Sequence, residues 1–598
     1  MMLHKLPMFN ICIALFILVS LFAAPTSASA EANEAPLLGK TITVTVFTDD
    51  ITKNGNCTLR EAIQAANTDK AVDKCPAGSG TDTIKLAAGT YEITIPGRFE
   101  YQNKTGDFDV TNSVKIVGAG FDKTIIDAKG NDRIFDLRSQ SATYEIRDMT
   151  LTNGLLLTDG KDIRDDGGAL ANKGSVTLTR VHFINNKIDQ NLGERGGAIF
   201  NGNKMKIVEC HFEENESAVY GGAIANAREL EVLDTDFVRN HAINGGAYYA
   251  DNNDSTAVFR RAFFIGNTNG PGEGSAMAMK GGGYVEVREA IFRDQGSSDG
   301  EVINNENSDL TIRYTLFHEN DGGGAGIINS KQGKVSISNS TFRFNRTSSE
   351  SGIITISGGT AVVDRMTFHD NAGEALWLAG GSTKVANSTF TGQTTSECAA
   401  AVCVTGGTAS FESVTIARNN SDDDPSLVVR GGKVTVHNSI IAQTMANGAP
   451  IVDCSVAKGT TTSQGYNLIS IARGCGWTPG KNDQLGTVEQ PVDPMLDAAL
   501  ADHGGYNSTL ALLPGSPAVD KADPANTVKT DQRIFARPAG PRSDIGAFEL
   551  NAVASTSKAS EIDPEAEVET APMEPFEFHE DYTEPGEEQE FQQDLVED

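Results

Sequence analysis

Four groups of acidic residues are the first candidates for chemistry in this sequence. Neighbouring carboxylates can act as a general acid and a general base, or they can bind Ca²⁺. The groups are dispersed along the chain, so each would need partners that the fold brings to it. They are Asp107 and Asp109 in TGDFDV, Asp165 and Asp166 in IRDDGG, Asp234 and Asp236 in LDTDF, and Asp422 to Asp424 in SDDDP.

Other reactive patterns are weak. Arg60 and Glu61 lie in NCTLREAIQAAN, a helix-like stretch that could carry chemistry or simply cover an apolar surface. The sequence contains no phosphate-binding loop, dinucleotide fingerprint, ordered Ser-His-Asp set or metal-binding cluster. We therefore expect no cofactor and no metal, and the sequence assigns no catalytic or binding residue.

The cysteines favour structural disulfides. Eight are present, and Cys12 lies in the apolar N-terminal segment, which leaves seven. No CxxC motif or Cys/His cluster occurs, so disulfides are a better explanation than a metal site. Connectivity is not fixed by the sequence, and Cys210 has no obvious partner. The local pairs are Cys57 with Cys75, Cys398 with Cys403, and Cys454 with Cys475.

A repeated phrase, F-x-x-N or a close variant, runs through the middle of the chain at intervals of 22 to 29 residues. Between successive copies lie a Gly-Gly-Ala phrase and a short alternating run such as GSVTLTRV. Each unit therefore contains three short β runs separated by turns. The anchors are Phe183, Phe212, Phe237, Phe264, Phe292, Phe317, Phe342, Phe368 and Phe390, followed by Ile416 and Ile440.

Three strands in about 25 residues predict an all-β fold, a right-handed parallel β-helix with three sheets and about 12 coils over residues 81–465. A propeller blade needs about 40 to 45 residues, and the leucine-rich consensus is absent. The anchor phenylalanines should stack as an aromatic column inside the helix, and the asparagines should bond their counterparts at a corner.

Several polar and aromatic residues could face outward from such coils. His182, His211, His318 and His369 recur beside the anchors at non-equivalent places, and the last two follow the phenylalanine two coils apart. Groups that could stack on sugar rings, although packing is the commoner role of such residues, are Tyr248, Tyr249, Tyr284 and Trp377.

The stretch 57–67 predicts an amphipathic helix within an N-terminal cap over residues 31–80. Thr58 and Glu61 have capping-box spacing, and an apolar stripe repeats at helical intervals. The end of a solenoid must be covered, because it exposes core and unpaired strand edges. The helix is therefore expected to be a plug, held by a Cys57–Cys75 bridge, with Arg60 as a surface contact.

The two ends of the chain differ in character. Residues 1–30 predict a Sec signal peptide cleaved after Ala30; a retained membrane anchor is the alternative, because Met8 to Ala24 is near the lower length limit for spanning. No later segment is apolar enough to cross a bilayer. Residues 551–598 contain sixteen acidic residues and one lysine, which predicts a disordered tail. The net charge of −31 argues against nucleic-acid binding.

CTLREAIQAAN resembles the Cys-Ser-Leu-Arg-Glu-Ala motif of exported bacterial proteins named for it, the CSLREA family, with Thr58 in place of serine. The stretch from GYNLIS to IGAFEL is similar to the choice-of-anchor Q domain. This resemblance implies a β-helix of the pectate-lyase-like superfold and a secreted or cell-surface location. Residues 466–550 should then wrap or cap the C-terminal end. No sorting signal follows Leu550, and the acidic tail takes that place.

Two functions remain open. The first is an adhesive, carbohydrate-contacting or structural role outside the cell, with polysaccharide or cell-surface components as partners. The alternative, implied by the superfold, is a secreted polysaccharide lyase or glycoside hydrolase. Fold alone does not decide between them. An enzyme needs carboxylates and a Lys or Arg that converge in one groove, whereas an adhesin needs only a long polar or aromatic face.

Overall fold

The computed structural model describes residues 39–554, apart from residues 99, 158–165, 190–194, 298–299, 349–350, 396 and 527. The expected signal peptide and the acidic tail from residue 555 onward lie outside the described residues. No described helix is long or apolar enough to cross a membrane.

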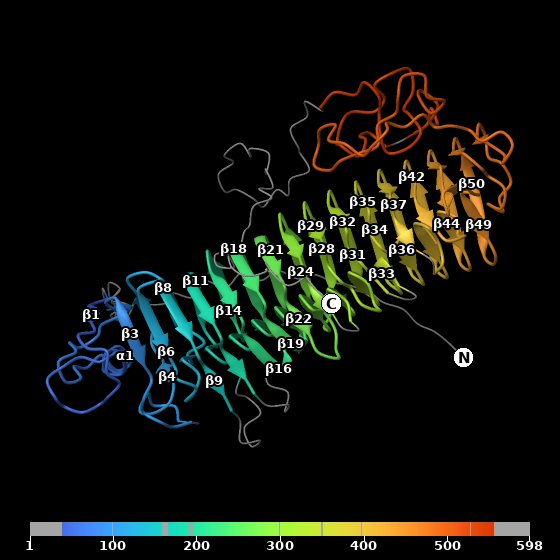
Figure 1. Cartoon of the computed structure of the whole chain (residues 1–598). Helices are drawn as coiled ribbons and strands as arrows, with labels where there is room; N and C mark the ends of the chain where they lie inside the picture. Colours follow the sequence, from blue (N-terminus) through green and yellow to red (C-terminus); the bar gives the residue numbers. More distant parts are fainter. Residues whose placement is uncertain are drawn as a thin grey trace, which may run out of the picture.

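The described chain forms a rod of stacked coils that runs from the blue N-terminal end to the orange end (Figure 1). Each coil adds one strand to a 14-stranded parallel sheet and two runs to a 28-stranded sheet. A residue with positive φ bends the larger sheet within each coil, for example Arg180 at 50° and Arg261 at 51°. The rod therefore has three β faces and about 13 turns, close to the 12 expected.

The strands of the 14-stranded sheet are β4 (Phe108–Val110), β7 (Phe135–Leu137), β10 (Leu170–Asn172), β13 (Ile199–Asn201), β17 (Ile224–Asn226), β20 (Tyr248–Ala250), β23 (Met277–Met279), β27 (Ile303–Asn305), β30 (Ile328–Ser330), β33 (Gly352–Ile356), β36 (Glu374–Leu378), β40 (Val402–Val404), β44 (Leu427–Val429) and β49 (Cys454–Val456).

The N-terminal half of the 28-stranded sheet contains β1 (Thr41–Thr43), β2 (Asp82–Lys85), β3 (Gly89–Glu92), β5 (Val114–Val117), β6 (Thr124–Asp127), β8 (Thr143–Thr152), β11 (Ser175–Ile184), β14 (Lys204–Val208), β15 (His211–Glu213), β18 (Glu229–Val238), β21 (Thr256–Ile265), β24 (Tyr284–Arg288) and β25 (Ile291–Arg293). Its remaining strands are β28 (Asp309–Arg313), β29 (Leu316–His318), β31 (Lys334–Ser338), β32 (Thr341–Arg343), β34 (Thr360–Asp364), β35 (Thr367–His369), β37 (Ser382–Ala386), β38 (Thr389–Thr391), β41 (Thr408–Glu412), β42 (Thr415–Ala417), β45 (Lys433–His437), β46 (Ile440–Ala442), β50 (Thr460–Gly465), β51 (Leu468–Ile469) and β52 (Gln484–Leu485).

Two small sheets join the turns between these faces. The first contains β9 (Leu155–Leu156), β12 (Lys187–Ile188), β16 (Glu216–Tyr220), β19 (His241–Asn244), β22 (Thr268–Asn269) and β26 (Gly296–Ser297). The second contains β39 (Thr394–Thr395), β43 (Asn420–Ser421), β47 (Met445–Ala446) and β48 (Ala449–Pro450).

Stacked side chains fill the interior. The nine anchor phenylalanines from Phe183 to Phe390 are fully buried. Neighbouring rings lie 4.3 to 5.2 Å apart and are nearly parallel. At the next corner, buried amides bond from coil to coil, as from Asn186 Nδ2 to Asn215 Oδ1 and from Asn215 Nδ2 to Asn240 Oδ1, both at 3.0 Å. This column and this ladder fix the register of the coils.

The N-terminal end is covered by α1 (Leu59–Thr68), which begins two residues later and ends one residue later than expected. Thr58 is the N-cap, and its hydroxyl and the Glu61 carboxylate complete both capping-box bonds at 3.1 Å. Asp69 is the C-cap of this helix and adopts the left-handed conformation with φ 53°. Its apolar stripe, Leu59, Ala62, Ile63 and Ala66, is buried.

Residues 466–550 were expected to wrap or cap the C-terminal end of the rod. β51 and β52 pair at the last coil, but residues 493–550, which we call the strap, turn back along the flank of the rod. Figure 1 shows this red segment beside the yellow and orange coils. Residues 141 to 167 positions apart in sequence are therefore in contact.

Four threonines in one row of the larger sheet hold the strap. They are register partners on β32, β35, β38 and β42, namely Thr341, Thr367, Thr389 and Thr415. Their hydroxyls bond strap groups at 2.6 to 3.2 Å, at Asn507, Ser508, Gln532 and Ala547.

Candidate functional site

Arg60 is not the surface contact expected from the sequence. Its side chain is fully buried, and its guanidinium donates to both carboxylate oxygens of Asp49, at 2.6 and 3.1 Å. It also donates to the carbonyl oxygens of Asp107 and Gly106, at 3.1 and 2.7 Å, and lies 4.7 Å from the Phe108 ring centroid. Arg60 therefore clamps the cap onto the first coils and is unavailable to a ligand.

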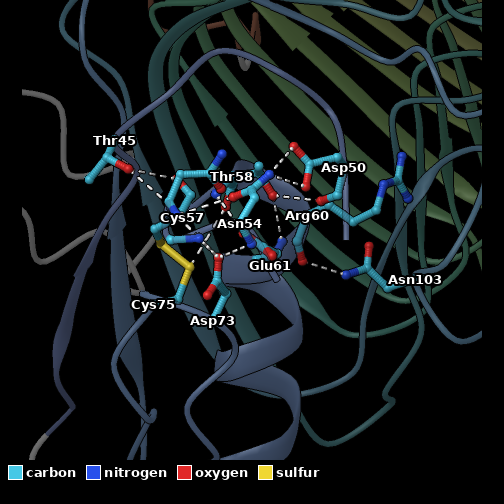
Figure 2. Close-up of a disulfide and its surroundings, with 12 residues drawn as sticks. Thr45, Asp50, Asn54, Cys57, Thr58, Arg60, Glu61, Asp73, Cys75 and Asn103 are labelled. Carbon is cyan, nitrogen blue, oxygen red and sulfur yellow. Dashed lines mark hydrogen bonds between the residues drawn. A yellow bond between two sulfur atoms is a disulfide. The ribbon is translucent and has the colours of Figure 1, made fainter. Parts of the chain in front are cut away.

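The surroundings of this clamp are equally structural. Figure 2 shows the Cys57–Cys75 disulfide beside the capping box, with Asn103 reaching the helix from a later loop. The Asn103 amide donates to the Arg60 carbonyl at 2.8 Å. The structure also pairs Cys398 with Cys403 and Cys454 with Cys475, and Cys210 is a buried free thiol.

Two of the candidate acidic groups, those at Asp107 and Asp166, lie close together near the N-terminal end of the rod. Their separation in the sequence did not indicate this proximity. Asp109 on β4 is the register partner of Asp136 on β7. Arg133 Nη2 lies 2.9 Å from Asp107 Oδ2 and 3.6 Å from Asp136 Oδ2. Its Nη1 donates to the carbonyl of Asp166 at 2.9 Å. Asp165 lies outside the described residues.

We call Asp107, Asp109, Asp132, Asp136 and Arg133 the acidic cluster. Three of its carboxyls have raised pKa values, and the cavity beside them is small. Burial raises the pKa of Asp107 well above its usual range and that of Asp109 to about 7, and it also raises the pKa of Asp132. Perturbed groups of this kind occur at active sites and in structural ion networks alike. The cavity that Asp107, Asp132 and Arg133 line holds about 10 Å³, enough for one water molecule. A sugar ring cannot enter a space of that size.

The remaining candidate acids lie elsewhere on the rod. Asp234 pairs with Arg261 at 2.5 Å, and Asp236 lies 3.5 Å from His211. Asp422 and Asp423 are exposed and Asp424 is half-buried. These groups do not join the cluster around Asp107.

The four histidines form two pairs. His182 and His211 are register partners with ring centroids 5.2 Å apart. His318 and His369 share one row, two coils apart as expected, with Arg343 between them. Together with the described acids and cysteines, they form no group of three that could hold a metal ion.

Three of the four aromatic candidates are inaccessible. Tyr248, Tyr249 and Trp377 are 0, 3 and 8% exposed, so they have the packing role that was the commoner expectation and cannot stack on sugar rings. Tyr248 faces the core, where its ring centroid lies 5.0 Å from that of Phe259, whereas Tyr249 is stacked against Tyr220 of β16 at 4.5 Å. Trp377 packs in a small buried cluster with the Cys398–Cys403 disulfide. Tyr284 is 37% exposed, and its hydroxyl donates to Glu286 at 3.0 Å.

An accessible aromatic pair lies where the strap contacts the rod just after β28. Tyr506 of the strap is 53% exposed, and its ring centroid is 4.4 Å from that of Tyr314. Burial raises the pKa of the Tyr314 phenol, while the positive charges of three nearby arginines oppose that rise. We call this group the tyrosine–arginine site; it consists of Tyr314, Tyr506, Arg288, Arg313 and Arg365.

The site is continuous with a row of like charges. Arg260, Arg288 and Arg313 are direct register partners on β21, β24 and β28. Arg288 is paired with Glu289 at 3.3 Å, but no described carboxylate forms an ion pair with Arg260 or Arg313. Like charges at directly paired positions destabilise a sheet. We call these three residues the arginine row, and a bound anion would relieve its repulsion.

Sequence reasoning could not find this site. Arg288 and Arg313 occupy the same outward position of the repeat, so the basic row was present in the alternating runs. Tyr506 comes from a segment nearly 200 residues away, and no local pattern places it on Tyr314.

Comparison with known proteins supports the fold. Residues 325–482 match the family model of the right-handed beta helix region, which confirms the expected right-handed parallel β-helix. Among solved structures, the chain is similar to the crystal structure of pectate lyase Pel9A. The identity is 13% and the TM-score 0.23, over 86% of this chain and 96% of that chain. No curated protein matches the sequence. A likeness this distant transfers no activity.

Proposed function

We propose that this protein is exported and binds an acidic polysaccharide at the tyrosine–arginine site, in a carbohydrate-contacting or adhesive role outside the cell. The observation that carries this proposal is the combination of an exposed Tyr506 with a row of arginines that is incompletely neutralised. Guanidinium groups recognise carboxylates through paired hydrogen bonds, and the face of a tyrosine ring can pack against the apolar side of a sugar.

The geometry of the coils suits a linear polymer. Successive strands of the sheet are about 4.8 Å apart, so the three guanidinium groups follow the rod axis at short intervals. A polymer with a carboxylate on each sugar could contact several of them at once. The three disulfides support export, because such bonds persist in oxidising compartments.

Binding of polygalacturonate to the mature chain tests this function, with a neutral dextran as the reference polymer. We expect Arg313→Gln with Tyr506→Ala to weaken binding by about tenfold, because a charge-assisted hydrogen bond contributes about 1.5 to 3 kcal/mol. The matched control replaces Lys384 and Lys433, two exposed lysines on the same sheet. Unchanged affinity in the site variant, or equal affinity for dextran, would refute the proposal.

The acidic cluster favours a second candidate, a polysaccharide lyase or hydrolase. Asp107 and Asp132 have raised pKa values and lie beside Arg133, which is the kind of convergence that an enzyme needs. An enzyme would have to open the small cavity before a sugar could reach these groups. Release of unsaturated uronates or reducing ends from acidic polysaccharides, lost in Asp132→Asn, would establish this function; no release from a broad panel would exclude it.

A further inference from the structure

The arginine row keeps uncompensated positive charge on a strongly acidic protein. The whole chain has a net charge of −31, yet Arg260 and Arg313 have no ion-pair partner among the described carboxylates. Arg313 is exposed and Arg260 is half-buried, so both can be reached from solvent. A polyanion that binds here would neutralise the positive charges of Arg260 and Arg313, which no described carboxylate pairs with.

The described chain ends close to this row. Ala554 forms an antiparallel bridge with Phe535, and Gly504 lies so close to Phe535 that an added Cβ would be 2.9 Å from its ring. Two residues after Gly504, the Tyr506 ring rests on Tyr314, the neighbour of Arg313. The chain therefore leaves the strap beside the tyrosine–arginine site.

The sequence that follows is complementary to the row in composition. Residues 555–598 contain sixteen acidic residues and one lysine. Aromatic residues are interleaved with the acids, as in EPFEFHEDY, so the segment offers carboxylates and rings to a surface of guanidinium groups and tyrosines. Its aromatic residues are Phe576, Phe578, Tyr582 and Phe591.

We propose that this acidic tail docks on the arginine row of its own molecule. With the random-coil dimensions that its composition predicts, the 44-residue tail would span roughly 35 Å on average, and the row extends over only about 10 Å. Tethering gives the tail an effective concentration on the order of millimolar at the row. Several weak charge pairs then suffice for occupancy, and salt should weaken them because the row is solvent-accessible.

The consequence for ligand binding rests on the proposed function. The tail and an acidic polysaccharide use the same guanidinium groups, so the tail acts as an intramolecular competitor. A polymer that displaces it must bind several arginines at once, whereas short or neutral glycans cannot. The tail thus selects for long, highly charged polymers.

The docking can be measured with a fluorescent peptide of residues 555–598, by anisotropy, on the full chain and on a chain that ends at Ala554. We expect the peptide to bind the shortened chain, and to bind the full chain about tenfold more weakly, since the tethered tail occupies the row. In the shortened chain, Arg260→Gln with Arg288→Gln and Arg313→Gln should reduce binding by about tenfold.

The matched control carries the same charge change on three exposed lysines elsewhere, Lys384→Gln, Lys433→Gln and Lys458→Gln, and should bind the peptide as before. A second variant keeps the full chain and removes four of the tail's sixteen acidic charges through Glu577→Gln, Glu580→Gln, Asp581→Asn and Glu584→Gln. It should bind added peptide more tightly than the native full chain does, which makes the test independent of truncation.

Three outcomes would overturn the tail proposal: equal peptide binding by full and shortened chains, peptide binding that survives loss of the arginine row, or tail-dependent dimers in light scattering, which would place the tail on a second copy. Polygalacturonate separates this failure from that of the proposed function. If the polymer binds both chains equally, only the tail proposal fails; if it binds neither chain while the peptide binds, only the polysaccharide proposal fails.

Discussion

Phe292 has its ring between those of Phe264 and Phe317, at centroid distances of 4.5 and 4.7 Å. Replacing it with alanine would remove both contacts and leave a cavity that rigid coils on either side cannot close. We expect the free energy of unfolding in urea to fall by about 3 to 5 kcal/mol. Phe344→Ala is the matched control, because that ring is 49% exposed, and it should cost about 0.5 kcal/mol or less. Equal losses would argue against the column as the main support.

Arg60 is a second residue whose burial decides its role. Arg60→Ala would leave Asp49, whose side chain is 3% exposed, without its partner, together with two carbonyl oxygens that lose their donor. Breaking a buried pair in this way costs about 3 to 5 kcal/mol. We expect the cap to be cleaved faster in limited proteolysis, while Thr58→Ala should cost only about 1 kcal/mol. Protease resistance equal to that of the native chain would contradict the clamp.

The outcomes for these residues show which contacts the sequence could predict and which it could not. The phenylalanine column was predictable because one anchor per coil must recur at the same inward position. The capping box was equally local, since Thr58 and Glu61 are three residues apart. Arg60 was misplaced because its partners, Asp49 and the carbonyls near residue 107, come from segments that only the closed cap brings together.

At the scale of elements, the strap packs on the last coils through a buried apolar cluster, which includes Leu512 and Phe548, and is also bonded to the threonine row by buried polar groups. The Gln532 amide is buried and bonds the hydroxyls of Thr389 and Thr367, at 2.6 and 2.7 Å, and the Met366 carbonyl at 3.0 Å. Gln532→Ala should cost about 1 to 3 kcal/mol, because these buried groups lose their partner. Hydrogen exchange should then increase in the strap and along β35 and β38, and remain unchanged in β11.

Gln490→Ala provides the control, because Gln490 is exposed and lies before the strap. Increased exchange throughout the rod would show that the strap supports the whole fold rather than docking locally. The sequence predicted that this region would associate with the end of the helix. It could not predict that the strap runs back along the rod, because the four threonines that bond the strap resemble any other outward row of the repeat.

At the scale of the whole molecule, the repeat predicted the solenoid, whereas the clustering of ionisable groups depends on distant contacts. Burial raises the pKa of Asp109, Glu301 and Glu549 to about 7 and that of Asp453 to about 6. These carboxyls lie on different coils and in the strap, so their effects on stability should be nearly independent.

Their combined effect has a definite sign. Each of these carboxyls binds its proton more tightly in the folded chain, so between its ordinary pKa and its raised pKa the folded state holds more protons. The free energy of unfolding should therefore fall as the pH rises from 5 to 8. His182 and His318 oppose this trend below pH 6.5, since burial lowers the pKa of His182 to about 4 and also lowers that of His318, but they are two groups against four carboxyls. Urea denaturation at several pH values measures the slope.

Asp109→Asn isolates one contribution to that slope. The amide at position 109 neither binds nor releases a proton when the chain folds. The unfolding free energy of the variant should therefore change less between pH 5 and pH 8 than that of the native chain. Asp122→Asn is the control, because its carboxylate is 59% exposed and should leave the slope as it was. A native stability that rises toward pH 8 would mean that these carboxyls are ionised in the folded chain, and the acidic cluster would then have to be an open, solvated site rather than a closed structural one.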